Sequence, residues 1–381
     1  MSIRVLRVCL LVLALATEVA AERHYVVSTT TDFVGGLGSG SFYALYPSID
    51  LRSIGAHSAL GANYAFGLNR QYADTKSHVA SVTFSRSSNR WRLNLSGSVQ
   101  MTPDFTTFNV LRGIAFDPQG GFRYLFDPVA IRRSSRISST SVGADYVLSR
   151  KSTVSVSGSY SQRQYGDQPL LKGRLSDQYR LSGNVAYARE QSARSSLGLG
   201  YTLTYYHFNQ FGIARSHAID IEYSHRFDPT VNLRAHVGPS YTQIGAKEKY
   251  FSYNASLSLE KLVQSNTFSV TYSRSGGEST GYGYLSETDQ VRIGANRRLS
   301  GRTSALLEIT AFDSRDKTTN KYNTRGTAVS GTITRTLNER LSVNVGAQLY
   351  SYGNVSVFGF SQEQLFFSLK YREPKLLKFS K

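Results

Sequence analysis

In many segments of the sequence, the residues at either the odd or the even positions are apolar. Basic side chains recur at the alternate positions of these segments. In residues 91–101, the odd positions are apolar except for Gly97, whereas the even positions are Arg, Asn, Ser, Ser and Gln. The cations on the polar parity are Arg52, Arg92, Arg180, Arg194, Arg226, Arg234, Arg292 and Lys370, against the acids Asp50, Asp145, Asp220, Glu222 and Glu308. An excess of positive charge attracts anions electrostatically. The candidate anion-binding residues of this set are Arg92, Arg180, Arg234, Arg292 and Lys370.

Residue patterns for enzymatic or metal chemistry are weak. The 7 histidines are scattered without metal-ligand spacing, and the single cysteine, Cys9, lies in an N-terminal apolar run. The glycine pairs match no phosphate-binding fingerprint. The sequence therefore predicts no cofactor, no metal site and no enzyme. One enzymatic alternative stays open, because abundant serines permit a Ser–His pair at one rim of the fold.

Strands must position the charged side chains, because a polarity period of two residues is the period of a β-strand. Alternating runs lie near residues 24–33, 42–52, 58–68, 77–86, 90–101, 138–148, 152–162, 177–189, 194–206, 216–226, 231–242, 249–260, 266–274, 287–297, 303–312, 324–335, 341–350 and 362–371. Short connections alternate with longer ones along this series. This alternation of connection lengths is typical of an antiparallel barrel with tight turns at one end. The prediction is about 18 strands, or 16 if the first two, which contain a Thr-rich run and Pro47, do not belong.

The N-terminus has the layout of a signal peptide. Arg4 and Arg7 precede the apolar run 9–16, and small residues end at Ala21. The expected divisions are a signal peptide at 1–21, one barrel domain at 22–371 and a periplasmic tail at 372–381. No later stretch has the roughly 18 apolar residues of a transmembrane helix. A mean hydropathy of −0.29 agrees with strands that expose only every second residue to lipid.

The formal net charge of +18 suits anionic lipid or an anionic solute. Nucleic acid is an unsuitable partner for an exported chain without a nucleic-acid-binding motif. These features together predict a single closed antiparallel transmembrane β-barrel in the outer membrane, in contact with membrane lipid and lipopolysaccharide.

The final run, 364–371, alternates Leu, Phe, Leu and Tyr with polar residues and resembles the C-terminal aromatic strand that the barrel-insertion machinery recognises. Residues 102–109 (TPDFTTFN) and 173–178 (GRLSDQ) look like loop and strand-entry segments of barrels found alongside exopolysaccharide export systems. The chain as a whole resembles porin-like outer-membrane barrels and, more loosely, that second group. The resemblance implies architecture and passive transport, and it carries over no functional residue.

The connection 102–137, roughly 36 residues long, is the strongest local candidate for function, since such long loops usually have one. It is rich in aromatic residues and contains two Asp-Pro turn signals. We expect it to fold into the lumen or over the mouth of the barrel. Its candidate anion-binding residues are Arg112, Arg123, Arg132 and Arg133.

The function that these patterns favour is a passive channel with a basic lumen. Its cargo is expected to be small anionic solutes or an acidic polysaccharide during export. The alternatives are a non-conducting structural or adhesive barrel and, less favoured, an enzyme acting at the lipid face.

Overall fold

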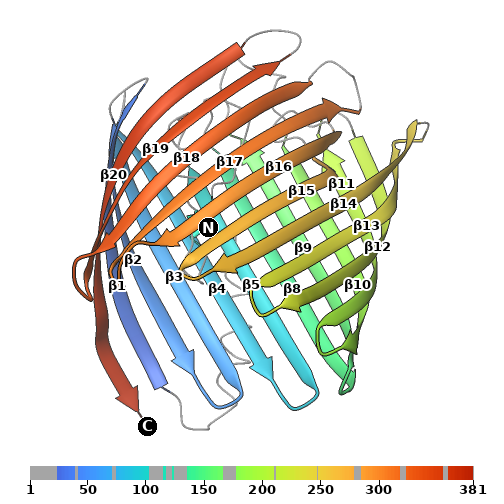
Figure 1. Cartoon of the computed structure of the whole chain (residues 1–381), viewed down its shortest axis with the longest axis horizontal. Coiled ribbons are helices and arrows are strands. Elements are labelled where there is room, and N and C mark those ends of the chain that lie inside the picture. The colour runs from blue at the N-terminus through green and yellow to red at the C-terminus, as the bar shows by residue number, and fades with distance from the viewer. Residues whose placement is uncertain are drawn as a thin grey trace.

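The computed structural model is an all-β barrel of 18 antiparallel strands in one closed sheet. It describes residues 24–38, 42–70, 74–102, 115–116, 122–123, 135–165, 177–209, 212–246, 248–278, 285–317, 323–354 and 359–380. Figure 1 shows the later strands, in orange and red, crossing in front of the earlier blue and cyan ones. No helix in these ranges is long and apolar enough to cross a bilayer.

The strands follow one another around the barrel in chain order. They are β1 (His24–Gly38), β2 (Phe42–Ile54), β3 (Ser58–Arg70), β4 (Asp74–Ser87), β5 (Trp91–Thr102), β8 (Ser135–Ser149), β9 (Ser152–Tyr165), β10 (Gln178–Ser192), β11 (Ser195–Phe208), β12 (Gly212–Asp228), β13 (Val231–Ile244), β14 (Glu248–Val263), β15 (Asn266–Glu278), β16 (Leu285–Arg298), β17 (Thr303–Asp316), β18 (Thr324–Thr336), β19 (Leu341–Asn354) and β20 (Gly359–Ser380). The two-residue strands β6 (Ala115–Phe116) and β7 (Phe122–Arg123) form a separate pair.

The barrel closes where the first strand meets the last. β1 pairs with β2, with His24 opposite Ile54, and also with β20, with His24 opposite Ser380. Both N-terminal strands are therefore part of the barrel, and the prediction of 18 strands, rather than 16, is confirmed. An 18-stranded barrel encloses a lumen instead of a core filled with side chains.

The sheet has an apolar outer face and a polar inner face, because the side chains alternate. Large apolar residues of one parity are exposed on the outside, among them Leu199, Val270, Ile293 and Leu365. Buried residues of the other parity include Thr204, Thr310, Ser330, Gln348 and Gln364. Outward tyrosines, such as Tyr64 and Tyr371, are exposed as expected for an aromatic girdle.

The strands are longer than the sequence pattern predicts. Most have 13 to 17 residues, and β20 has 22, whereas about 9–11 residues suffice to cross the hydrocarbon. The additional residues are mainly polar and extend beyond the apolar belt. β20 continues past Tyr371 to Ser380, and residues 372–380 pair with the beginning of β1.

Six of the short turns contain the same kind of local hydrogen bond from the backbone to a side chain. A Ser, Asn or Asp side chain accepts a hydrogen bond from the backbone N–H two residues later, as in the turns beginning at Ser88, Ser149, Ser192, Asp228, Ser300 and Asn338. These side chains stabilise the turn without help from distant residues. In five of the six, the residue that donates is Arg or Lys, so the turns concentrate positive charge at one end of the barrel.

Candidate functional site: the inner face of the barrel

The five strand residues predicted to bind anions all lie on the inner parity, but they differ in their partners. Arg292 Nε lies 3.6 Å from Glu308 Oε1, on the neighbouring strand. Lys370 Nζ lies 3.8 Å from Asp32 Oδ2, and these two residues are directly opposite in the register. Two of the five predicted cations therefore form ion pairs with inward carboxylates.

The other three cations lack an ion pair among the described residues. The Arg180 guanidinium lies 5.9 Å from the centre of the Tyr206 ring, at the end of the barrel that carries the long connections. Arg92 is opposite Asp145, whose carboxylate accepts a hydrogen bond from Ser155 at 2.7 Å. Arg234 is exposed in the lumen wall. These three are the inner-face positions best placed to meet a passing anion.

The structure adds inward charges that sequence reasoning missed. Asp32 lies in the Thr-rich first strand, which the sequence analysis treated as uncertain, and Asp316 is fully buried at the end of β17. Arg163, on β9, also has the inner parity, since it is opposite Gln178. The predicted run 24–33 already contains Asp32, and extending the runs 152–162 and 303–312 by the same two-residue period would have found Arg163 and Asp316. The net positive charge of the inner wall is thus smaller than the sequence suggests.

The four candidates in the long connection are not brought together by the described residues. Arg112, Arg132 and Arg133 lie outside them. Arg123 belongs to the short strand β7, where its backbone is opposite Ala115. Their expected role at a constriction stays a prediction.

A basic ring surrounds the turn end of the barrel. Every short turn from the second onward has at least one cation in it or within three residues of it, among them Arg90, Arg150, Lys151, Arg194, Arg226, Lys261, Arg298, Arg302 and Arg340. The acids of the same turns are Glu190, Asp228 and Glu339. Some of these arginines also brace the next hairpin: the Arg194 and Arg302 guanidiniums donate to the carbonyls of Phe227 and Leu337, both at 3.3 Å.

Inward aromatic rings pack against the wall. Tyr46 is opposite Gly67 and Phe366 is opposite Gly346, and a Cβ at either glycine would overlap the ring. Tyr206 is buried and stacks on Phe208, with 6.1 Å between ring centres. These rings cover glycine backbone or each other, an arrangement that stabilises sheets, so they offer few free faces for stacking on a sugar.

The described histidines show no nucleophile–base pair. The rings of His78 and His217 contact the hydroxyls of Tyr64 and Tyr201 on the outer face, and His236 Nε2 lies 2.9 Å from Asp220 on the inner face. No cluster of three or more metal-ligating side chains occurs in the described ranges. Nothing among these residues favours the alternative of a lipid-face enzyme.

The fold matches a group of solved barrels. OpdK from Pseudomonas aeruginosa, solved with vanillate, is 10% identical over 94% of this chain and 99% of that chain, with a TM-score of 0.54. OccK2 (OpdF) from the same organism, solved with glucuronate, is 12% identical over 93% and 98%, with a TM-score of 0.54. OccAB4 from Acinetobacter baumannii is 10% identical over 93% and 99%, with a TM-score of 0.51.

These neighbours are porin-like outer-membrane barrels, and the similarity establishes that this chain shares their fold. No protein-family model matches the sequence, and no curated protein is significantly similar to it.

Proposed function

We propose that the chain is an outer-membrane channel for the passive passage of small anionic solutes. The observation that carries this proposal is a closed barrel of 18 strands with an apolar outer face and a polar, charged inner face. Such a barrel is stable only with its belt in lipid, and its size leaves an aqueous path. The N-terminal segment 1–21 would direct export, and the barrel-insertion machinery would recognise the final strand.

The basic turn ring and the inner cations support a preference for anions. The ring surrounds the periplasmic opening, where positive charge raises the local concentration of anions. Arg92, Arg180 and Arg234 then provide weak sites along the wall. Weak and multiple sites suit conduction, because the solute must also leave.

The ligands of two structural neighbours agree with a small acid as cargo. Vanillate and glucuronate are both carboxylates. An acidic polysaccharide is less favoured, because Tyr46, Tyr206 and Phe366 pack against the wall and leave few ring faces to guide a sugar chain. The association with exopolysaccharide export has no support from the structural neighbours.

Reversal potential in a planar bilayer under a KCl gradient tests the proposal. We expect the wild type to prefer chloride and the double variant Arg92→Gln/Arg234→Gln to lose part of that preference. Arg292→Gln should shift the reversal potential further toward cation preference than Arg92→Gln alone or Arg234→Gln alone, because it leaves Glu308 without its partner. Deleting residues 104–136 should raise conductance and weaken selectivity if the long connection forms the constriction.

Lys249→Gln is the matched control, since Lys249 is exposed on the outer parity and its loss should not alter the potential. A folded barrel without conductance would favour the non-conducting structural alternative. A wild-type preference for cations would refute the basic lumen.

A further inference from the structure

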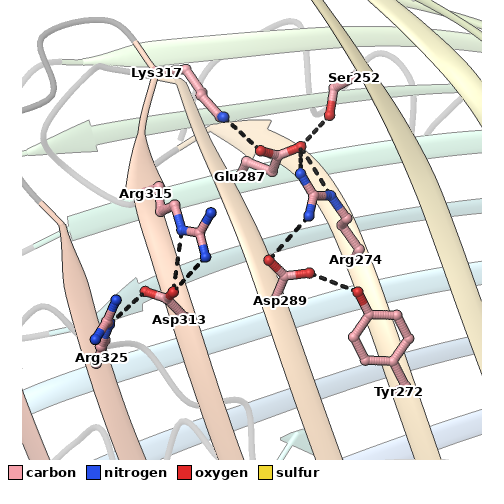
Figure 2. A network of polar contacts seen from close by, with 9 residues as sticks. All are labelled: Ser252, Tyr272, Arg274, Glu287, Asp289, Asp313, Arg315, Lys317 and Arg325. Carbon is pink, nitrogen blue, oxygen red and sulfur yellow. Dashed lines mark hydrogen bonds and ion pairs between the residues drawn. The ribbon is translucent and has the colours of Figure 1, made fainter.

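An ionic network lies on the lipid-facing parity of β15–β18, at the end opposite the short turns (Figure 2). Four of its residues are successive partners across the strands: Arg274 is opposite Asp289, which is opposite Asp313, which is opposite Arg325. They share their parity with Val270, Ile293 and Ile309 of the apolar belt. This row of four residues therefore lies on the outer face of the sheet.

Each carboxylate of the network is held by two or more donors. Asp313 contacts Arg315 at 2.9 Å and Arg325 at 3.2 Å. Asp289 accepts from the Tyr272 hydroxyl at 2.8 Å and lies 3.4 Å from Arg274.

Glu287 lies at the side of the network nearest β14, where β14 and β15 no longer pair beyond Ala255 and Arg274. It contacts Arg274 at 2.8 Å and Lys317 at 2.7 Å, and it accepts a hydrogen bond from Ser252. Two carboxylates directly opposite each other, Asp289 and Asp313, would repel without this surrounding positive charge.

Three of the four cations of the network are more exposed than its acids, whereas Arg274 is only 18% exposed. The Arg325 and Arg315 side chains are 72% and 50% exposed, whereas Glu287 and Asp313 are 3% and 23% exposed. Four cations face three carboxylates, so the set retains a formal positive charge, and its most exposed groups are the guanidiniums of Arg315 and Arg325 and the Lys317 ammonium. Such a surface is complementary to phosphate, which guanidinium binds through paired hydrogen bonds.

The depth of the network agrees with a headgroup position. On β16, eight residues separate the lipid-facing Arg297, near the turn end, from Asp289. At ~3.4 Å per residue and a strand tilt of ~40°, this distance corresponds to ~20 Å along the membrane normal, close to the ~25 Å apolar band of such barrels. If Arg297 marks the periplasmic edge of the band, Asp289 and its partners lie at the opposite edge, level with the outer-leaflet headgroups.

We propose that this network is a docking site for the phosphorylated headgroup of lipopolysaccharide, with Arg315 and Arg325 as its main phosphate-binding groups. The inference rests on the proposed outer-membrane location, although it does not depend on the lumen's conducting. Asp313, which contacts both guanidiniums, then acts as the positioning residue that holds them at the surface. Lipid A, with its phosphates, is the one outer-leaflet lipid to which we assign the site.

The test measures binding of purified rough lipopolysaccharide to the barrel in detergent by native mass spectrometry. The double variant Arg315→Gln/Arg325→Gln should bind about tenfold more weakly than wild type, since two exposed charge contacts are lost. The control Arg297→Gln/Arg335→Gln removes the same charge from the same face at the turn end and should bind like wild type. Lipid A without phosphates should bind the wild type no better than it binds the double variant.

Three outcomes would overturn the site. Equal loss in both double variants would show a nonspecific charge effect, and equal binding of phosphatidylglycerol would show a general anionic-lipid surface. Weakened heat-modifiable migration of the first variant in lipid-free detergent, with unchanged lipopolysaccharide binding, would show that the network only braces the sheet. Conductance of the same samples, measured in phosphatidylcholine, separates this test from that of the channel.

Discussion

Replacing Leu95 with Arg should destabilise the barrel far more than replacing its neighbour Ser96 with Arg. Leu95 is on the outer parity, opposite Phe84 and Val142, about halfway between the turn preceding β5 and the other rim. A guanidinium there faces hydrocarbon and costs about 2–4 kcal/mol near the midplane. That cost corresponds to a roughly thirtyfold to several-hundredfold shift of the folding equilibrium.

The matched substitution on the inner face should reduce the stability of the barrel only slightly. Ser96→Arg places the charge in the water-filled lumen and removes one exposed hydrogen bond, between the Ser96 and Ser141 hydroxyls at 2.7 Å. A hydrogen bond of this kind contributes about 1 kcal/mol or less. The two variants therefore differ by about 1–3 kcal/mol although they are one residue apart.

Equilibrium unfolding of the refolded proteins in guanidinium, followed by heat-modifiable gel migration, measures the difference. We expect a lower midpoint and a smaller folded fraction for Leu95→Arg. Equal midpoints would refute the assignment of the two faces or the presence of lipid around the belt. A lower midpoint for Ser96→Arg would mean that the inner wall is packed and dry.

Three further predictions concern local packing. Gly346→Ala should push the Phe366 ring into the lumen and lower single-channel conductance; adding Phe366→Ala should restore the conductance only in part, because the new Cβ would also lie 2.7 Å from the Gly331 carbonyl oxygen. Gly238→Ala should cost about 2 kcal/mol or more of stability in denaturant unfolding, because its Cβ would collide with the Ile219 carbonyl. Asp228→Ala should lower the Tm near pH 7, where the carboxylate accepts bonds from the Thr230 hydroxyl and from the N–H groups of Thr230 and Val231, which hold the pKa of Asp228 below its usual range. Since a lowered pKa stabilises the fold above the unfolded-state pKa, this Tm difference should shrink as the pH falls below about 4; a difference as large at pH 3 as at pH 7 would contradict the role of the carboxylate.

Much of the fold could be predicted because the decisive signal is local. A two-residue period specifies the strand and its two faces together, and it placed Arg92 and Arg292 on the polar face without a structure. Closure is a global property, so the membership of β1 and β2 required the pairing of His24 with Ile54 and Ser380. The lengths of the strands were underestimated because their polar ends continue beyond the apolar pattern.

The charge network was missed for a different reason. Arg274 and Asp289 lie inside the predicted runs 266–274 and 287–297 but on the apolar parity, and Asp313 lies one residue beyond the run 303–312. Only the register aligns them into one row. The pairing of Lys370 with Asp32 likewise joins residues more than three hundred positions apart, which a single sequence does not reveal.

The pairing of β1 with β20 allows the order of the strands in the chain to be changed without changing which strands are neighbours in the barrel. His24 and Ser380 are paired neighbours at the turn end of the barrel, and β20 extends downward there in Figure 1. A short linker could join them without crossing the lumen, and new termini could open at any of the short turns, whose side-chain hydrogen bonds are local. Circular permutants of this kind would keep every strand neighbour while changing which hairpin is made first and which enters the membrane last. Comparing their assembly rates would separate the contribution of strand order to insertion from that of strand sequence.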